Sequence, residues 1–454
     1  MPYEGEFAHY RPLQRIAENE QVKALLGRSR VRESSGEESP HTVDLSDVRP
    51  SDWVPDWVLA VDGSHAEVKI ENGFPGAEVS YVTVASVLLD VAKMTRLDAA
   101  RPVDPQEFRT TEQAESIDRA LPGCNIVIDG EGSARDSLRR SMLEVFKETR
   151  MAPDGESLLD TYEALLEYKP ESQEQRCPHE DCLDHAKLYK RGQGEYTCSC
   201  SHAKPLYSVD ALRVYEGMQP AGTNGAMFAE IMQVWERIWA VHILRTLEQK
   251  GWLSTLRRLA VVLDGPLAVF GHPAWLSHAI YKELSRINEE AKKSTDGLDL
   301  LMLGIEKSGA FVNHLLDLDR SAEGGEGVFP CQTAVLLTDD YIKKNIIFSD
   351  SSKLYGRDTY FGRKIMYKTA SGSLIVASLP FLSEYHCDTT TAAQDQFPRL
   401  ADALSILEQL VSSRYPNSLS PLVAAHAEAA IPLHLGNRVL ENLARQLVME
   451  EASS

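Results

Sequence analysis

The 454-residue chain has no long apolar run and no excess of basic residues. About 20 consecutive apolar residues are needed to cross a bilayer, so we expect no membrane association. The start of the chain, Met1 to Glu6, is acidic and contains an early proline, unlike a secretory signal peptide. We therefore expect a cytoplasmic protein whose seven cysteines are reduced unless they bind a metal.

The shortage of positive charge limits the kind of nucleic-acid contact that the chain can make. Its formal net charge is −20, whereas proteins that bind DNA over a broad surface usually carry a basic patch. Either nucleic acid is not the substrate, or a partner supplies the basic track and this chain needs only local basic contacts. The sequence also lacks a G-x4-G-K-[ST] phosphate loop, so it shows no sign of an ATPase motor of its own.

The mixture of strand-like and helix-like segments predicts an α/β fold, with a mixed β-sheet core flanked by helices. One polar segment, residues 170–206, is short of aliphatic side chains and contains four of the cysteines. This composition is typical of a small module inserted into a larger domain. We predict a helical N-terminal arm at residues 1–50, a core in two parts at residues 51–169 and 207–454, and the insertion between them.

Some local elements bear directly on a candidate site. Two strands, residues 57–62 and 66–70, are expected to pair through a turn at Gly63 and Ser64. A further short strand is expected at residues 125–128. A long helix is expected at residues 225–250, because apolar side chains recur there at helical spacing.

Four cysteines of the insertion have the layout of a zinc site. They form two close pairs, C-x4-C and C-x-C, separated by 15 residues that include a glycine-rich turn. Four thiolates around one tetrahedral zinc make a closed, structural site. Histidines in the same segment can each replace a cysteine, and the alternative is four incidental reduced thiols. We predict a structural Zn²⁺ bound by Cys177, Cys182, Cys198 and Cys200.

Two apolar runs each end on an aspartate that is followed by glycine. Residues 58–61 lead into Asp62, and residues 259–263 lead into Asp264. Each Asp-Gly pair alone is most simply a turn. Two carboxylates that leave neighbouring strands at one sheet edge would, however, bind Mg²⁺ or Mn²⁺, which prefer oxygen ligands. Such a cation serves phosphodiester cleavage by activating water and neutralising the phosphate.

Other candidate site residues lie on predicted helices or next to a strand. Glu236 is among apolar residues of the long helix, where a carboxylate is costly unless it is paired or metal-bound, and Glu230 flanks the same stripe. Lys307 directly follows a predicted strand and is a candidate phosphate contact, although a lone lysine is usually a surface residue. His426 lies in a small, apolar helix as either a core histidine or a metal ligand or proton shuttle.

The order of these motifs resembles that of the NurA nucleases. The resemblance covers about residues 53–450, and most of its weight lies on the two aspartate motifs. In chain order the matching segments are Val61-Asp62-Gly63-Ser64, the acidic helix, Leu263-Asp264-Gly265-Pro266-Leu267, Ile305-Glu306-Lys307-Ser308, Tyr415-Pro416 and Pro421 to His426.

The resemblance implies a ribonuclease-H-like core that degrades DNA from 5′ to 3′ with Mn²⁺ or Mg²⁺. It also implies a homodimer and a HerA-like hexameric ATPase as partner. By position, Asp62, a helix glutamate and Asp264 would bind the metal, with Glu236 preferred to Glu230, and His426 would be the active-site histidine. Compact NurA proteins lack the zinc-ribbon-like insertion, which indicates a larger bacterial variant.

Two other functions stay open at this point. In the first, the aspartates are only turns and the chain is a non-catalytic scaffold that mimics DNA with its acidic surface, while the zinc module binds a partner. In the second, the site is a phosphohydrolase that acts on nucleotides. The nuclease prediction itself covers both DNA end processing in repair and defence against phage.

Overall fold

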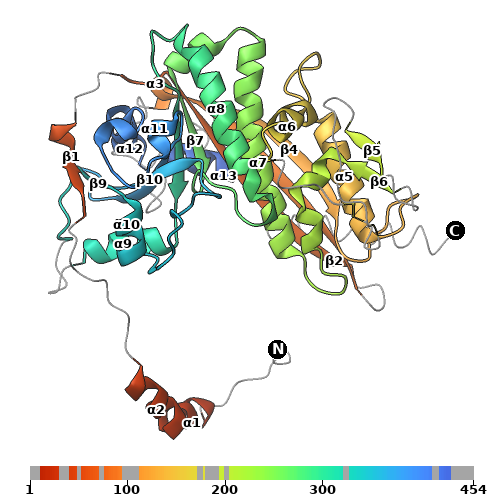
Figure 1. Cartoon of the computed structure of the whole chain (residues 1–454), viewed down its shortest axis with the longest axis horizontal. Helices are drawn as coiled ribbons and strands as arrows, with labels where there is room; N and C mark the ends of the chain where they lie inside the picture. The colour runs from red at the N-terminus through yellow and green to blue at the C-terminus, as the bar shows by residue number, and fades with distance from the viewer. Residues whose placement is uncertain are drawn as a thin grey trace.

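The structure, a computed structural model, places one large mixed sheet at the centre of the protein, with helices on both faces (Figure 1). None of the described helices is both long and apolar enough to cross a lipid bilayer. The residues described are 11–29, 40–48, 53–70, 76–94, 112–170, 177–178, 182, 194–198, 204–320, 327–411 and 419–430.

The sheet has nine strands in the order β1-β9-β10-β11-β8-β7-β2-β3-β4. Strand β2 pairs antiparallel with β3, and β3 with β4, while β7 lies parallel to β2 on its other side and β8 parallel to β7. This mixed sheet, flanked by helices, confirms the predicted α/β fold class. The strands are β1 (Thr42–Asp44), β2 (Trp57–Ile70), β3 (Ala77–Asp90), β4 (Glu112–Pro122), β7 (Leu259–Asp264), β8 (Leu301–Glu306), β9 (Thr333–Leu336), β10 (Gly362–Lys368) and β11 (Leu374–Pro380).

The two faces of the sheet are covered by different helices. Successive side chains of a strand point to opposite faces, so Leu59 and Val61 of β2 pack in the core formed with α5 to α8, whereas Val58 and Ala60 pack in the core that contains α12 and α13. The α-helices are α1 (Arg11–Glu18), α2 (Glu20–Arg28), α3 (Val91–Met94), α5 (Ala134–Glu148), α6 (Leu158–Leu166), α7 (Gly225–Gln249), α8 (Leu276–Lys292), α9 (Ala310–Leu318), α10 (Asp339–Asn345), α11 (Glu384–Cys387), α12 (Leu400–Leu410) and α13 (Ser420–Ala429).

Strand β2 differs from the sequence-based expectation. It runs without interruption through Gly63 and Ser64, so the turn predicted there is wrong. Both residues pair with β3, opposite Val84 and Thr83. The long β-branched partner strand and burial on both faces outweigh the low strand propensity of a single glycine.

Strand β4 was not recognisable from its composition, because it is polar and holds several charged residues. Among the described strands it pairs only with β3, and an edge strand tolerates such side chains. The strand expected at residues 125–128 is not formed. Instead the chain turns after β4, with Asn125 at a φ of 57°, a conformation that asparagine tolerates better than most residues.

Two smaller parts complete the described chain. Helices α1 and α2 lie apart from the sheet in Figure 1, whereas β1 of the predicted N-terminal arm pairs with β9. In the insertion, β5 (Glu195–Thr197) and β6 (Pro205–Tyr207) form a short antiparallel hairpin.

Candidate active site

Asp62 and Asp264 lie side by side because β2 and β7 are parallel neighbours. The last paired residues of these strands are Val61 and Leu263, and each aspartate is the next residue along. Strand β7 ends at Asp264, whereas β2 continues past Asp62. The sequence therefore predicted the proximity of the two aspartates correctly, but Asp62 lies within a strand and not at a turn.

The Asp62 carboxylate is buried and held from two sides. Only 2% of the residue is exposed. Its Oδ1 accepts a hydrogen bond from the backbone N–H of Gly63 at 2.8 Å. Its Oδ2 lies 3.2 Å from Nδ1 of His426 on α13. One contact from β2 and one from α13 thus orient this buried carboxylate.

Lys307 brings a positive charge between the two aspartates. Its Nζ lies 2.7 Å from Oδ1 of Asp264 and 3.8 Å from Oδ2 of Asp62. Burial raises the pKa of Asp264, the charge of Asp62 adds to this effect, and Lys307 opposes it. The ammonium group therefore partly compensates two like charges that would otherwise repel each other.

Glu236 reaches the same region from α7. A Cβ atom on Gly63 would lie 2.5 Å from Oε1 of Glu236, so the glycine leaves the space that this carboxylate fills. Only 3% of Glu236 is exposed. Burial raises the pKa of its carboxyl to about 8, Arg237 opposes this shift, and the charges of Asp62 and Asp264 reinforce it. Three acidic side chains from β2, α7 and β7 thus influence one another.

Arg237 is a buried residue of the site that sequence reasoning missed. Its Nη1 donates to Oε2 of Glu236 at 2.8 Å, and its Nη2 donates to the backbone oxygens of Asp264 at 2.8 Å and Pro266 at 3.2 Å. The arginine therefore fixes both the helix carboxylate and the turn after β7, where Gly265 has a φ of 72°. Its signal was a basic residue next to Glu236 within the otherwise apolar middle of the long helix.

Glu230, the second candidate on α7, has a different environment. Its Oε1 accepts a hydrogen bond from the backbone N–H of His272 at 2.9 Å. Six residues along an α-helix correspond to about 600° of rotation, so Glu230 and Glu236 project from different sides of α7. The geometry brings Glu236, and not Glu230, into contact with the region of Asp62 and Asp264.

His426 is more exposed than the carboxylate that it contacts. Its side chain is 60% exposed, compared with 3% for Asp62. The hydrogen bond to Asp62 raises the pKa of His426, and partial burial opposes that shift. A largely exposed imidazole on a buried carboxylate can exchange protons with solvent while it holds the carboxylate in place.

The donor set at this site suits a divalent cation. Asp62, Glu236 and Asp264 offer carboxylate oxygens, which Mg²⁺ and Mn²⁺ prefer. The Lys307 ammonium already bridges two of these side chains, which shows that the space between them accepts a positive charge. A bound cation would also favour the ionised form of Glu236, because a nearby positive charge lowers the pKa of a carboxyl.

A separate cluster of thiols lies in the insertion. The Sγ atoms of Cys177, Cys182 and Cys198 are buried and lie within 4.8 Å of one another. The 3.7 Å between Cys182 and Cys198 matches the separation of about 3.8 Å expected for two sulfurs at about 2.3 Å from a tetrahedral zinc. Cys200, the predicted fourth ligand, lies outside the described residues.

Comparisons with known proteins place the chain in one family through a sequence model. No curated protein matches the chain in sequence. Among solved structures it is similar to the crystal structure of the NurA nuclease from Sulfolobus solfataricus, at 10% sequence identity and a TM-score of 0.33, over 97% of this chain and 92% of that one. The sequence model of the NurA domain matches residues 57–431. With the match extending over most of its length, from β2 to beyond α13, the chain belongs to the NurA domain family.

Proposed function

We propose that this protein is a DNA nuclease that depends on Mn²⁺ or Mg²⁺. The observation that supports the proposal most strongly is the convergence of Asp62, Glu236 and Asp264 from three elements, in a chain of the NurA domain family. A phosphodiesterase needs such a constellation because carboxylates can hold the cation against a negatively charged substrate.

Each side chain of the site has a role in this proposal. Asp62, Glu236 and Asp264 hold the cation, which when bound lowers the pKa of the attacking water and neutralises charge on the phosphate. Lys307, released from its carboxylates, binds a phosphate oxygen. His426 orients Asp62 through Nδ1 and moves protons to and from solvent. Arg237 positions Glu236 and the Asp264 turn.

We further propose a setting for this activity. The protein acts in the cytoplasm as a homodimer and degrades or processes DNA ends from 5′ to 3′, in repair or in defence against phage. A HerA-like hexameric ATPase moves the DNA, since the sequence of this chain has no phosphate-loop motif and a net charge of −20. The cysteine module binds a structural Zn²⁺. Light scattering of a homodimer would give twice the chain mass of 50.5 kDa.

The direct test offers 5′-labelled and 3′-labelled DNA, and nucleoside triphosphates in parallel, to the purified protein. With Mn²⁺ or Mg²⁺ we expect DNA to be degraded from the 5′ end, and with EDTA we expect no degradation. Hydrolysis of nucleotides without DNA cleavage would identify a phosphohydrolase. Absence of any cleavage, with either metal and with the ATPase added, would identify a non-catalytic scaffold.

A further inference from the structure

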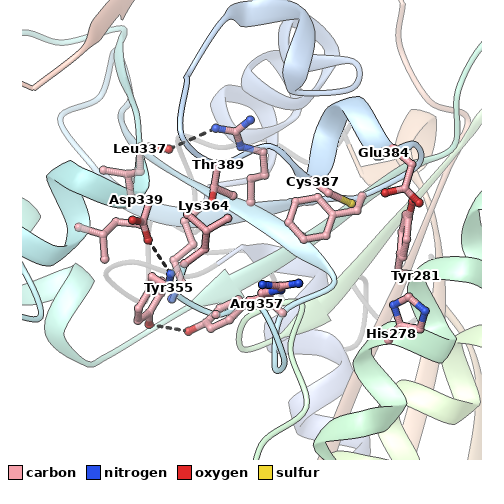
Figure 2. Close-up of a pocket in the computed structure, with 17 residues that line it drawn as sticks. His278, Tyr281, Leu337, Asp339, Tyr355, Arg357, Lys364, Glu384, Cys387 and Thr389 are labelled. Atoms are coloured by element: carbon pink, nitrogen blue, oxygen red, sulfur yellow. Dashed lines mark hydrogen bonds between the residues drawn. The ribbon is translucent and has the colours of Figure 1, made fainter. Parts of the chain in front are cut away.

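A cavity lies outside the carboxylate site. Its volume is about 550 Å³, and it opens between α8, α10 and β10 (Figure 2). Small-molecule sites in proteins typically measure about 300–1,000 Å³, so the cavity has room for a ligand larger than an inorganic ion. The proposed nuclease activity makes no use of it.

The cavity has two arginines without a carboxylate partner in the described part of the chain. Arg357 is exposed, and Figure 2 shows it between Tyr355 and His278. Arg363 is 3% exposed and donates only to backbone oxygens, those of Asp388, Leu337 and Thr391. Burial lowers the pKa of Arg363 to about 10, and the nearby charge of Asp388 opposes that shift. The charge available to a ligand is therefore mainly that of Arg357.

The acidic residues of the cavity are, in contrast, already paired. Asp339 forms an ion pair with Lys343 at 2.7 Å, and Glu384 forms one with Lys282 at 2.8 Å. The buried Lys364 pairs with Glu306. The cavity thus has a surplus of positive charge within a protein whose net charge is −20, and this surplus favours an anionic ligand.

Aromatic rings form much of the remaining wall. The hydroxyls of Tyr355 and Tyr360 lie 2.9 Å apart, and their ring centroids 5.4 Å apart. On another side, the rings of Tyr281 and Phe381 meet edge to face with centroids 6.3 Å apart. Tyr281 and Phe381 are buried, whereas Tyr355 and Tyr360 are partly exposed. Aromatic rings that remain accessible in a cavity can stack with the bases of nucleic acids irrespective of sequence.

Backbone hydrogen bonds and ion pairs connect the cavity to the carboxylate site. Thr359 and Phe361, which flank its residue Tyr360, hydrogen-bond to Val269 and Leu267 in the segment after Asp264. At the end of β8, Glu306 pairs with Lys364 of the cavity, while the next residue, Lys307, pairs with Asp264. The two sites are therefore linked through the end of β8 and the segment after Asp264.

We propose that this cavity binds a nucleotide, with its phosphate on Arg357 and its base against the aromatic wall. The ligand is either a free mononucleotide or one nucleotide of a DNA strand, since both offer an anionic phosphate and a planar ring. The inference does not depend on the proposed nuclease activity, because binding can be measured without a metal.

The test measures binding of dAMP, adenosine, inorganic phosphate and a single-stranded oligonucleotide by titration calorimetry in EDTA. Without a metal, the three carboxylates of the other site oppose the binding of a phosphate there, and a signal that Arg357→Glu weakens reports on the cavity. We expect dAMP to bind at least tenfold more tightly than adenosine or phosphate. Arg357→Glu should weaken dAMP binding at least tenfold, and Arg320→Glu, which makes the same change at an exposed arginine outside the cavity, should change it less than twofold.

The oligonucleotide identifies the source of the ligand. If the oligonucleotide competes with dAMP and binds Arg357→Glu more weakly than the wild type, the cavity binds one nucleotide of a DNA strand. If the oligonucleotide does not compete, the cavity binds the free mononucleotide. The inference is overturned if dAMP does not bind, if Arg357→Glu binds dAMP as the wild type does, or if phosphate alone binds as tightly as dAMP.

Discussion

Gly63 lies where β2 passes close to α7. The residue has no positive φ, so glycine is not required there by the backbone conformation. It is required because a side chain would occupy space that Glu236 fills. That space holds the carboxylate of Glu236, which Arg237 fixes from the other side. A side chain at this position would push the carboxylate away from Asp62 and Asp264.

We predict that Gly63→Ala reduces nuclease activity without unfolding the protein. The new Cβ would lie 2.5 Å from Oε1 and 3.2 Å from Cγ of Glu236, and displacement of a catalytic group by about 1 Å costs about 100-fold in rate. The measurement is the cleavage rate together with the thermal unfolding midpoint. Gly27→Ala is the control, because nothing lies within 4 Å of the new atom there. Equal rates for both variants would contradict this role of Gly63.

His242 is a second residue whose burial has a measurable consequence. The residue is fully buried on α7, and its Nδ1 lies 2.7 Å from the hydroxyl of Thr161. Burial lowers its pKa to about 4, and Arg245 adds to the effect. Between pH 6.5 and 4 the unfolded chain therefore binds a proton that the folded chain does not.

We predict that this histidine makes the protein less stable as the pH falls from 6.5 towards 4. One proton of difference corresponds to about 1.4 kcal/mol of unfolding free energy per pH unit. Urea unfolding at several pH values measures the slope for the wild type and for His242→Gln. His242→Gln should show a smaller change of unfolding free energy with pH than the wild type does. His272→Gln, at an exposed histidine, should show the same change as the wild type. Identical slopes for the wild type and His242→Gln would contradict the prediction.

At the scale of elements, the long periodic segments were predictable and the polar or interrupted ones were not. Helix α7 (Gly225–Gln249) and strand β7 follow the apolar pattern of the sequence closely. Strand β4 is polar, and β2 contains the Asp-Gly pair of a typical turn. Their conformations are decided by pairing with β3, a tertiary effect that local composition does not record.

The candidate site was predictable to a similar degree. Asp62 and Asp264 were identified because each follows an apolar run, and Lys307 because it follows β8. The choice between Glu236 and Glu230 depended on the rotation of α7 relative to the sheet, which the sequence does not specify. Arg237 contacts backbone oxygens across the fold, so its role required the structure.

For the insertion, we predict about one bound zinc per chain. Removal of zinc by a chelator should lower the thermal unfolding midpoint, because a structural zinc contributes directly to folding. Cys182→Ser should lose the metal, since Cys182 is buried beside Cys198. Cys331→Ser, at an exposed cysteine, should retain it. Metal analysis of the three proteins is the measurement, and a zinc-free wild type of full stability would contradict the prediction.

At the scale of the whole molecule, the net charge affects how fast the protein would associate with DNA. A net charge of −20 repels DNA at long range, and repulsion of this kind slows association most at low ionic strength. The local positive charges at Lys307 and around Arg357 act only at short range. A partner that supplies the DNA track would therefore change substrate capture more than the chemical step.

We predict that a HerA-like ATPase lowers the KM of the nuclease for DNA at least tenfold and leaves kcat within about threefold. Initial rates over a range of DNA concentrations, with and without the ATPase, measure both constants. An ATPase variant that cannot hydrolyse ATP serves as the control for translocation. An unchanged KM in the presence of a bound ATPase would contradict the claim that the partner improves DNA capture.

The most direct test of the central claim compares two strand-end aspartates of the same sheet. Asp264 ends β7 at the carboxylate site, whereas Asp90 ends β3 opposite Trp57, at the other end of β2. We predict that Asp264→Asn loses at least 1,000-fold in Mn²⁺-dependent DNA cleavage while its unfolding midpoint stays close to that of the wild type, and that Asp90→Asn cleaves as the wild type does. Cleavage by Asp264→Asn at the rate of Asp90→Asn would contradict the account.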